Sequence, residues 1–158
     1  MEAKKAFKIF HYMTQLRWTG ERRGELASHG KPTLEIAAPP EFKGHPGRWT
    51  PEDLFVAAVD ICTMTTFLAF AAHKKLGLVL YQSTAEGTLE NVEGKYQFTQ
   101  VTVSPHVTVA TEEEIPAAEQ ILRDVEASCL ISNSITAHVE IQAVIQSEAA
   151  SLKPLVIV

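Results

Sequence analysis

The sequence predicts an α+β fold in which antiparallel strands, about six of them, combine with two main helices. Three observations favour this class. Strand-like segments joined by short turns outnumber helical ones, the stretch from Leu54 to Ala72 is almost entirely apolar, and a later segment carries apolar residues at spacings of three and four. With 158 residues, 46% of them hydrophobic and 21% charged, the chain has the composition of one globular domain, which we assign to residues 1–158.

The N-terminal part of the chain predicts three strands and a loop. Its first segment is rich in Phe, Ile, Tyr, Met and Trp, which favour strands, and glycines then bracket the turn TGERRG. Alternating Leu34 and Ile36 predict a short strand with one buried face. The expected elements are a strand at Phe7–Trp18, a turn at Thr19–Gly24, strands at Glu25–Ser28 and Thr33–Ala37, and a loop at Pro39–Gly47.

A long helix is predicted from Thr50 to about Lys75. Thr50 suits the N-cap, a proline follows at the first helical position, and two acids complete the first turn. From Leu54 to Ala72, 15 of 19 residues are apolar, so the helix is apolar nearly all round and needs cover on every side. We expect a sheet on one side and a partner subunit on the other. Asp60 and three threonines argue against the alternative of a membrane span.

The C-terminal half predicts two long strands, a helix and a last strand. In the second long strand the alternation of apolar residues changes parity, which predicts a bulge near Thr99 or Gln100. The helical segment places Cys129 at the end of its buried stripe. The expected elements are strands at Val79–Leu89 and Lys95–Val109, a helix from Thr111 to about Cys129, a strand at Val139–Ile145, and a C-terminal extension at Ser147–Val158.

Charge and motif content exclude several classes of function. The formal net charge is -5, and no run of Lys or Arg exceeds two residues, so we expect no nucleic-acid partner. The N-terminal residues lack the pattern of a signal peptide, so the expected location is the cytoplasm. The six histidines show no metal-ligand spacing, and no phosphate-binding loop is present, so we expect no metal and no cofactor.

The two cysteines, Cys62 and Cys129, are the residues best suited to a chemical reaction. In a cytosolic chain such a pair is either two buried thiols or a redox pair. Cys62 lies about ten residues into the long helix, where the helix dipole no longer lowers a pKa. Burial alone raises the pKa of a thiol, so a reactive Cys62 requires a nearby cation. The alternative is a small apolar residue in a core helix.

Three blocks of sequence, in this order, resemble one known family. They are TGERRG, then PPEFKGHPGRWT leading into TPEDLFVAAVDIC, and finally EASCLISNS at Glu126–Ser134, where the family typically has C-P-x-S-N. The chain thereby resembles the OsmC/Ohr family of thiol peroxidases, which reduce organic hydroperoxides, and the order of its predicted elements fits along nearly the whole chain. The resemblance implies an OsmC-like fold with the apolar helix buried at a dimer interface.

The resemblance also implies roles for particular residues. Cys62 falls on the peroxidatic thiol and Cys129 on the resolving thiol. Glu52 falls on the assisting glutamate, and Arg22 on the assisting arginine of the T-G-x-R pattern. On this reading Cys62 becomes a sulfenic acid, a Cys62–Cys129 disulfide follows, and an external thiol or lipoyl dithiol reopens it. The active sites would be shared between the two subunits of a homodimer.

Two of these assignments have an ordinary structural alternative. Arg22 is also explained as a solvated turn residue, and Arg23 or Arg17 could be the partner of the thiolate in its place. Glu52 is also explained as a first-turn acid that the helix dipole favours.

Two residues depart from the family pattern. Leu130 replaces the proline after the second cysteine, which could change how the chain turns there. Asp60 lies two residues before Cys62, where a buried anion would raise the pKa of the thiol. We expect Asp60 to face the subunit partner or a cation such as Arg48. These departures keep open a second function: a non-enzymatic dimer of the same fold that binds a hydrophobic ligand or senses redox state.

Overall fold

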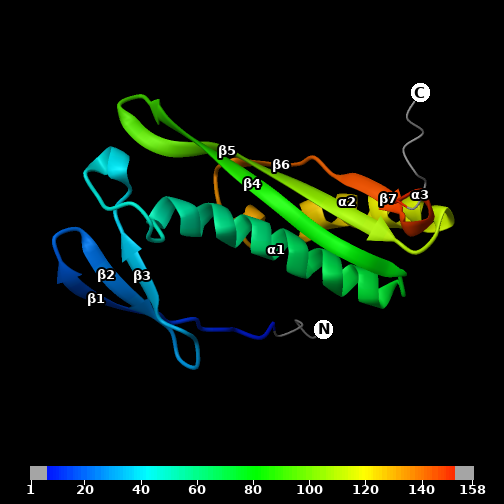
Figure 1. Cartoon of the computed structure of the whole chain (residues 1–158), viewed down its shortest axis with the longest axis horizontal. Helices are drawn as coiled ribbons and strands as arrows, with labels where there is room; N and C mark the ends of the chain where they lie inside the picture. The colour runs from blue at the N-terminus through cyan, green and yellow to red at the C-terminus, as the bar shows by residue number, and fades with distance from the viewer. Residues whose placement is uncertain (1–6, 152–158) are drawn as a thin grey trace, which may run out of the picture. The chain divides into compact units, whose positions relative to one another are not determined.

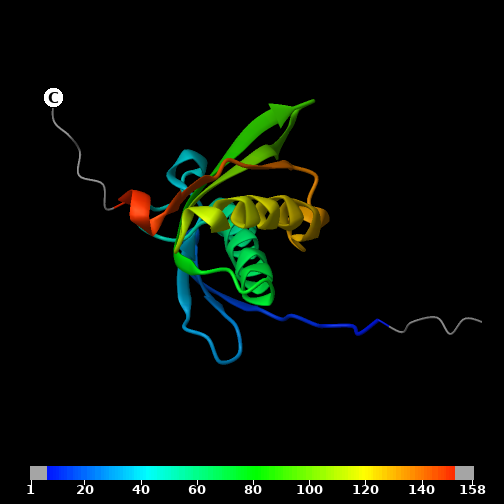
Figure 2. The same cartoon turned by 90° about the vertical axis from the view of Figure 1, so that its right-hand side faces the viewer.

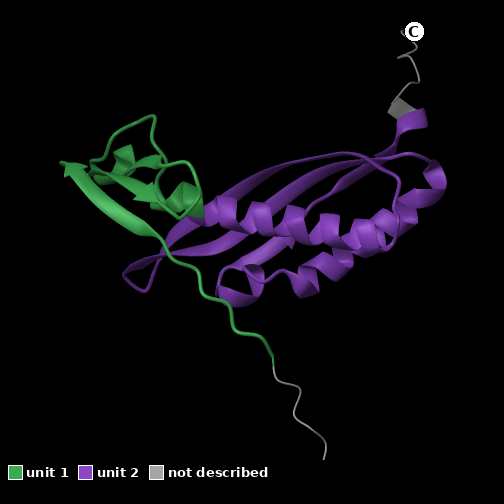
Figure 3. Ribbon diagram, turned by 90° about the horizontal axis from the view of Figure 1, so that it is seen from below, with its two compact units in different colours: residues 1–54 green, residues 55–158 purple. Residues whose placement is uncertain are grey.

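The structure is a computed structural model, and it describes residues 7–151. The chain divides into two compact units, residues 1–54 and residues 55–158 (Figure 3). Each unit is described by itself. The assignment of residues 1–158 to a single domain stays a prediction, and the expected extension lies outside the described residues from residue 152 onward.

Unit 1 contains an antiparallel sheet in the order β1 (Gln15–Gly20), β2 (Arg23–Ala27), β3 (Leu34–Ala37) (Figure 1). The short helix η1 (Pro40–Phe42) interrupts the expected loop. The strand predicted at Phe7–Trp18 is wrong in its first half, because β1 begins only at Gln15. Residues 7–14 have the composition of a strand, but no strand in the described part of the chain pairs with them.

Unit 2 is built on a sheet whose central strand is β5 (Lys95–Val109). Strand β4 (Leu78–Val92) pairs with it antiparallel through a tight turn at Glu93 and Gly94, whose φ angles are 51° and 85°. The register moves from Thr88 opposite Gln100 to Leu89 opposite Phe98, which leaves Thr99 as the extra residue. The predicted bulge is therefore confirmed.

The last strand differs from the expectation of antiparallel pairing. It consists of two short strands, β6 (His138–Ile141) and β7 (Val144–Ser147), and both pair parallel with β5. The reason is the helix α2 (Ile115–Ser128), which carries the chain from the end of β5 back to its start. Parallel neighbours require such a crossover. The α+β class is confirmed, with one antiparallel and one mixed sheet.

Both main helices begin as their sequences predict. Helix α1 (Pro51–His73) is capped by Thr50, whose Oγ1 accepts a hydrogen bond from the Asp53 backbone N–H at 3.1 Å. Helix α2 follows the short helix η2 (Glu112–Glu114), where Thr111 and Glu114 form a capping box. The remaining short helices are η3 (Ser132–Ser134) and α3 (Glu148–Ser151).

The core of unit 2 lies between one face of the sheet and the two helices (Figures 1 and 2). Alternate residues of β5 supply the sheet side of this core. One apolar cluster joins the second half of α1 to α2, and the other gathers near the start of α1. The fully buried members from β5 are Val101, Val103, Val107 and Val109, and those from the helices are Val59, Phe67, Ala118, Ile121 and Val125.

Helix α1 is covered on one side within the described chain. Its buried residues recur every four positions: Val59, Thr63, Phe67 and Ala71. On the opposite face the side chain of Ile61 is 56% exposed, although the helix has a mean hydropathy of 1.9 over its most apolar window. By length and composition α1 is the one helix among residues 7–151 that could also cross a membrane. Cover on its second face stays a prediction.

Candidate active site

The two thiols meet in unit 2. Cys62 lies in α1, Cys129 is the C-cap residue of α2, and both are free cysteines. Their thiols lie close enough that each acts on the pKa of the other. The structure therefore brings together the two residues that the sequence predicts as a redox pair.

The packing of the two helices explains why the thiols are neighbours. Cys62 lies on the flank of the buried stripe of α1, directly before Thr63. Cys129 ends the buried stripe of α2, and its N–H donates to the Val125 carbonyl at 2.9 Å. Both helices pack on the same side of the sheet, and the end of the α2 stripe lies beside the flank of the α1 stripe that carries Cys62. Cys129 is 1% exposed, whereas Cys62 is only partly buried.

The environment separates the acidities of the two thiols. Burial, followed by the interaction with Cys129, raises the pKa of Cys62. Burial also acts to raise the pKa of Cys129, but hydrogen bonds from Cys62, from Ser132 and from the Ile131 backbone outweigh it, and the net direction is down. No cationic side chain of the described residues is among the causes that act on Cys62. A reactive Cys62 therefore still requires a cation.

Sequence reasoning missed three groups that surround the thiols. Thr66 lies one turn after Cys62, with 4.0 Å between its Oγ1 and the sulfur. Ile131 and Ser132 offer backbone N–H groups, and Ser132 also offers its hydroxyl. Helical spacing could have identified Thr66, since residues four apart share a face. The Ser132 contacts depend on the turn after α2, which the sequence does not specify.

The residue before Leu130 has an extended backbone. Cys129 has φ −66° and ψ 117°, and this ψ lies close to the values that a following proline favours. The side chain of Leu130 is 75% exposed, and its carbonyl accepts a hydrogen bond from Ser134 Oγ at 2.7 Å.

Asp60 has a different neighbour from the expected cation. Ser83 Oγ of β4 donates to Asp60 Oδ1 at 2.6 Å, whereas Arg48 is paired with Glu35 at 3.3 Å. Asp60 lies on the opposite flank of α1 from Cys62 and is not among the causes that shift the pKa of Cys62. It acts instead on Tyr81, whose pKa is raised to about 12 by burial and by the Asp60 charge.

Glu52 is placed in the first turn of α1, within unit 1. One of its carboxylate oxygens, Oε2, is buried and accepts no hydrogen bond from the described residues. A buried carboxylate oxygen without a donor is costly, so this position calls for a partner. A first-turn acid that served only the helix dipole would normally face water.

The arginines of unit 1 differ in their partners. Arg17 pairs with Glu25 at 2.5 Å and Arg23 with Glu21 at 3.2 Å. Arg22, in the turn between β1 and β2, donates from Nη1 to the carbonyl of Phe42 in η1. Arg22 thus retains a charge that no carboxylate of the described residues neutralises, which distinguishes it from the other two.

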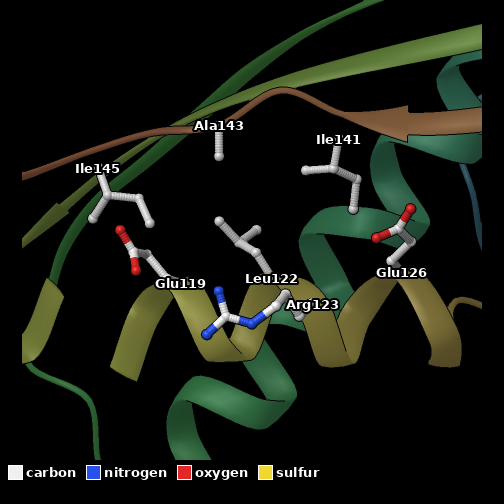
Figure 4. Close-up of a pocket in the computed structure, with 7 residues that line it drawn as sticks. All are labelled: Glu119, Leu122, Arg123, Glu126, Ile141, Ala143 and Ile145. Atoms are coloured by element: carbon white, nitrogen blue, oxygen red, sulfur yellow. The ribbon is translucent and has the colours of Figure 1, made fainter. Parts of the chain in front are cut away.

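Two hollows lie apart from the thiols. The groove in unit 2, of about 240 Å³, has an apolar floor and charged residues of α2 along its rim (Figure 4). The polar hollow in unit 1 has about 210 Å³ and contains Arg23 and Arg48. The groove is lined by Glu119, Leu122, Arg123, Glu126, Ile141, Ala143 and Ile145.

Within residues 7–151, no three His, Cys, Asp or Glu side chains gather as metal ligands.

Comparison with known proteins identifies relatives over most of the chain. Residues 44–144 match the family described as OsmC-like protein. A Bacillus subtilis (strain 168) protein, the uncharacterized YmaD, is 27% identical over 138 residues, which are 84% of this chain and 91% of YmaD. An OsmC-like protein of unknown function from Vibrio cholerae has a TM-score of 0.79 at 22% identity, covering 86% of this chain and 100% of that one.

A second solved structure has the same architecture. It is named as an organic hydroperoxide resistance protein OsmC from Legionella pneumophila. Its TM-score is 0.69 at 24% identity, with 89% of this chain and 99% of that chain covered. Both structural likenesses show the fold.

Proposed function

The chain belongs to the OsmC-like family, and we propose that it is a thiol peroxidase that reduces organic hydroperoxides to alcohols. The observation that carries the proposal is the contact between Cys62 and Cys129, supplied by two different helices. The name of the Legionella neighbour, an organic hydroperoxide resistance protein, supports the same chemistry.

The reaction begins at Cys62, which is the more exposed of the two thiols. Its thiolate attacks the terminal oxygen of the hydroperoxide, so that a sulfur–oxygen bond forms and the O–O bond breaks. The departing alkoxide takes up a proton and leaves as the alcohol. Cys62 is then a sulfenic acid, and Cys129 attacks its sulfur to form a disulfide while the hydroxyl leaves as water.

An external dithiol completes the cycle. It gives two electrons and two protons to the Cys62–Cys129 disulfide and becomes a disulfide itself. A dihydrolipoyl group is the reductant that we propose, since its two thiols close a ring on oxidation.

Arg22 supplies the cation that Cys62 lacks. A guanidinium is charged at any working pH and stabilises a thiolate, so it would lower the pKa that burial raises. Of the three candidate arginines, Arg22 is preferred because Arg17 and Arg23 are already paired with carboxylates. Glu52 has an unpartnered oxygen with which to hold the guanidinium in place.

The functional unit that we propose is a homodimer with shared active sites. Ile61 and Leu68 give the second face of α1 an exposed apolar surface, 56% and 38% exposed respectively, which a second copy of the chain would cover. The orphaned oxygen of Glu52 supports the same arrangement, because a group from a second copy could donate to it.

Peroxide titration tests the mechanism. One equivalent of cumene hydroperoxide should convert the reduced protein to an intramolecular Cys62–Cys129 disulfide, read by non-reducing mass spectrometry. With a dihydrolipoyl reductant the wild type should consume peroxide continuously, whereas Cys62→Ser should be inactive and Cys129→Ser should stop at the sulfenic acid. Persistent free thiols, or bridges only between chains, would rule the mechanism out.

The surroundings of the thiols predict the preferred substrate. Ile61, next to Cys62, and Leu130, next to Cys129, expose apolar side chains, 56% and 75% exposed respectively. The tail of a bulky hydroperoxide would gain about 25 cal/mol for each Å² of apolar surface that it buries here. Cumene hydroperoxide should therefore be reduced with a higher kcat/KM than hydrogen peroxide, measured by coupled oxidation of the dithiol. Equal efficiency with both would contradict an apolar site.

The raised pKa of Cys62 favours a second candidate, a non-enzymatic dimer that binds a hydrophobic ligand or senses redox state. The rate of Cys62 alkylation as a function of pH separates the two. In the assembled protein, a Cys62 pKa below that of free cysteine is expected for the peroxidase. A value above it would favour the non-enzymatic dimer.

A further inference from the structure

The turn that carries Arg22 is fastened to the loop after β3 by a group of contacts within unit 1. Arg22 donates to the Phe42 carbonyl, and its own carbonyl accepts from the Ala38 N–H at 3.0 Å. His45 closes the same loop, because its N–H donates to the Ala38 carbonyl at 3.1 Å. Arg22 is therefore bound to the loop at two points, Ala38 and Phe42.

Glu21 occupies the centre of this arrangement. Its Oε2 lies 2.9 Å from His45 Nε2 and 3.2 Å from Arg23 Nη2, so one carboxylate oxygen joins the loop to β2. Its backbone carbonyl accepts a hydrogen bond from the Trp18 indole at 2.9 Å. With φ at 50°, Glu21 also adopts the left-handed conformation that reverses the chain directly before Arg22.

We propose that Glu21 is a positioning residue for Arg22, held in place by its contacts with His45 and Arg23. The proposal rests on the peroxidase function, in which Arg22 must meet a thiolate. Glu21 touches neither substrate nor thiol in this mechanism, and acts by fixing the turn. The charged groups with contacts in this network, among the described residues, are Glu21, Arg22, Arg23 and His45.

The charge of Glu21 explains how it can fix the turn. Arg23 is cationic, and its ion pair with Glu21 joins the turn to β2. Replacing Glu21 by glutamine removes this charge, weakens the ion pair and lets the turn that carries Arg22 move.

The first test uses NMR and needs no catalysis. The indole N–H of Trp18 donates to the Glu21 carbonyl, so its signal, assigned by its loss in Trp18→Phe, should move in Glu21→Gln and in His45→Gln relative to the reduced wild type. Glu35→Gln, which breaks a separate ion pair in unit 1, should leave the signal unchanged. An indole signal that is the same in Glu21→Gln as in the wild type would overturn the proposal.

The second test measures peroxide reduction. Glu21→Gln should lower kcat/KM for cumene hydroperoxide by about two- to fivefold, the size that a partly exposed ion pair can supply. The alkylation pKa of Cys62 should rise in the same variant, because a less fixed Arg22 stabilises the thiolate less. Glu21→Asp should restore part of the rate. An unchanged Cys62 pKa overturns the positioning role, and a wild type without peroxidase activity overturns it together with the proposed function, while the indole signal still decides whether Glu21 fixes the turn.

Discussion

Tyr81 carries its hydroxyl into the interior of unit 2, where it interacts with Ser83 but forms no hydrogen bond of standard geometry with the described residues. Its ring packs against the buried Phe67, with 5.3 Å between the ring centroids. Burial and the charge of Asp60 together raise the pKa of the phenol to about 12. Burial of the ring stabilises the core, whereas burial of the hydroxyl costs free energy.

Replacing Tyr81 by phenylalanine should therefore stabilise the protein. Because the folded state holds the phenol proton more tightly than the unfolded chain, the contribution of this proton to stability is complete below about pH 10 and is lost as the pH rises toward 12. Tyr81→Phe should raise the free energy of unfolding at pH 8 by about 1 kcal/mol. It should also reduce the loss of stability between pH 10 and pH 12, measured by urea unfolding.

Tyr12→Phe is the matched control, since that side chain is 91% exposed and should change neither quantity. A Tyr81→Phe variant that is markedly less stable at pH 8 would show that the hydroxyl has a partner.

Among the elements, the packing of α1 on β4 depends on one glycine. A Cβ atom at Gly87 would lie 2.5 Å from Val56 of α1 and 2.8 Å from the ring of Phe98 on β5. Phe98 in turn stacks on Phe55 of α1, with 4.5 Å between ring centroids. Only a glycine allows the first turns of α1 to approach the sheet this closely.

Gly87→Ala should therefore destabilise unit 2 by about 1–3 kcal/mol, because the helix and the Phe98 ring must both move away. Chemical unfolding measures the loss, and the Phe55–Phe98 contact should weaken in the NMR spectrum. Glu86→Ala, on the exposed face of the same strand, is the control and should have little effect. Equal effects of the two substitutions would show that the contact is not tight.

The sequence specified those elements that local patterns determine. Thr50 and Asp53 predicted the start of α1, and the change of parity predicted the bulge at Thr99, because caps and alternation act within a few residues. The parallel pairing of β6 could not be predicted in this way, since it depends on the path of α2 across the sheet.

The candidate site shows the same division between features that local patterns predict and features that depend on distant segments. The stripe spacing placed Cys129 on a buried face, which the structure confirms, and the family resemblance paired it with Cys62. The two thiols interact in the structure, and their roles as a redox pair stay a prediction. The hydrogen bonds of Ser132 and the partner of Asp60 were not predictable, because each depends on side chains from distant segments. The roles of Arg22 and Glu52 stay predictions.

At the scale of the whole molecule, the second face of α1 predicts the state of association. A helix this apolar leaves Ile61 and Leu68 exposed in a single copy, and a second copy of the chain is the cover that we propose for this face. Ile61→Glu should place a charge in that interface and convert the dimer to monomers, detected by light scattering. Peroxidase activity should be lost together with the dimer, and Glu113→Lys on η2 should change neither.

The strongest test of the dimer is whether two defective chains can restore one site. Helix α1 is continuous from Pro51 to His73, so Glu52 and Cys62 are separated by ten residues, or about 15 Å along the axis. One guanidinium cannot contact both within a single straight helix. If Arg22 joins the carboxylate to the thiolate, the carboxylate and the thiolate must come from different copies of the chain.

Mixed dimers of Glu52→Ala and Cys62→Ser chains therefore have a definite expected behaviour. Each homodimer lacks the same group in both of its sites and should be weak or inactive. In the mixed dimer one site combines Cys62 of one chain with Glu52 of the other, and the second site lacks both groups. Activity per mixed dimer should thus approach half that of the wild type, measured as dithiol-dependent consumption of cumene hydroperoxide. Mixed dimers without recovery, or an active protein that is monomeric by light scattering, would show that each site is built from a single chain.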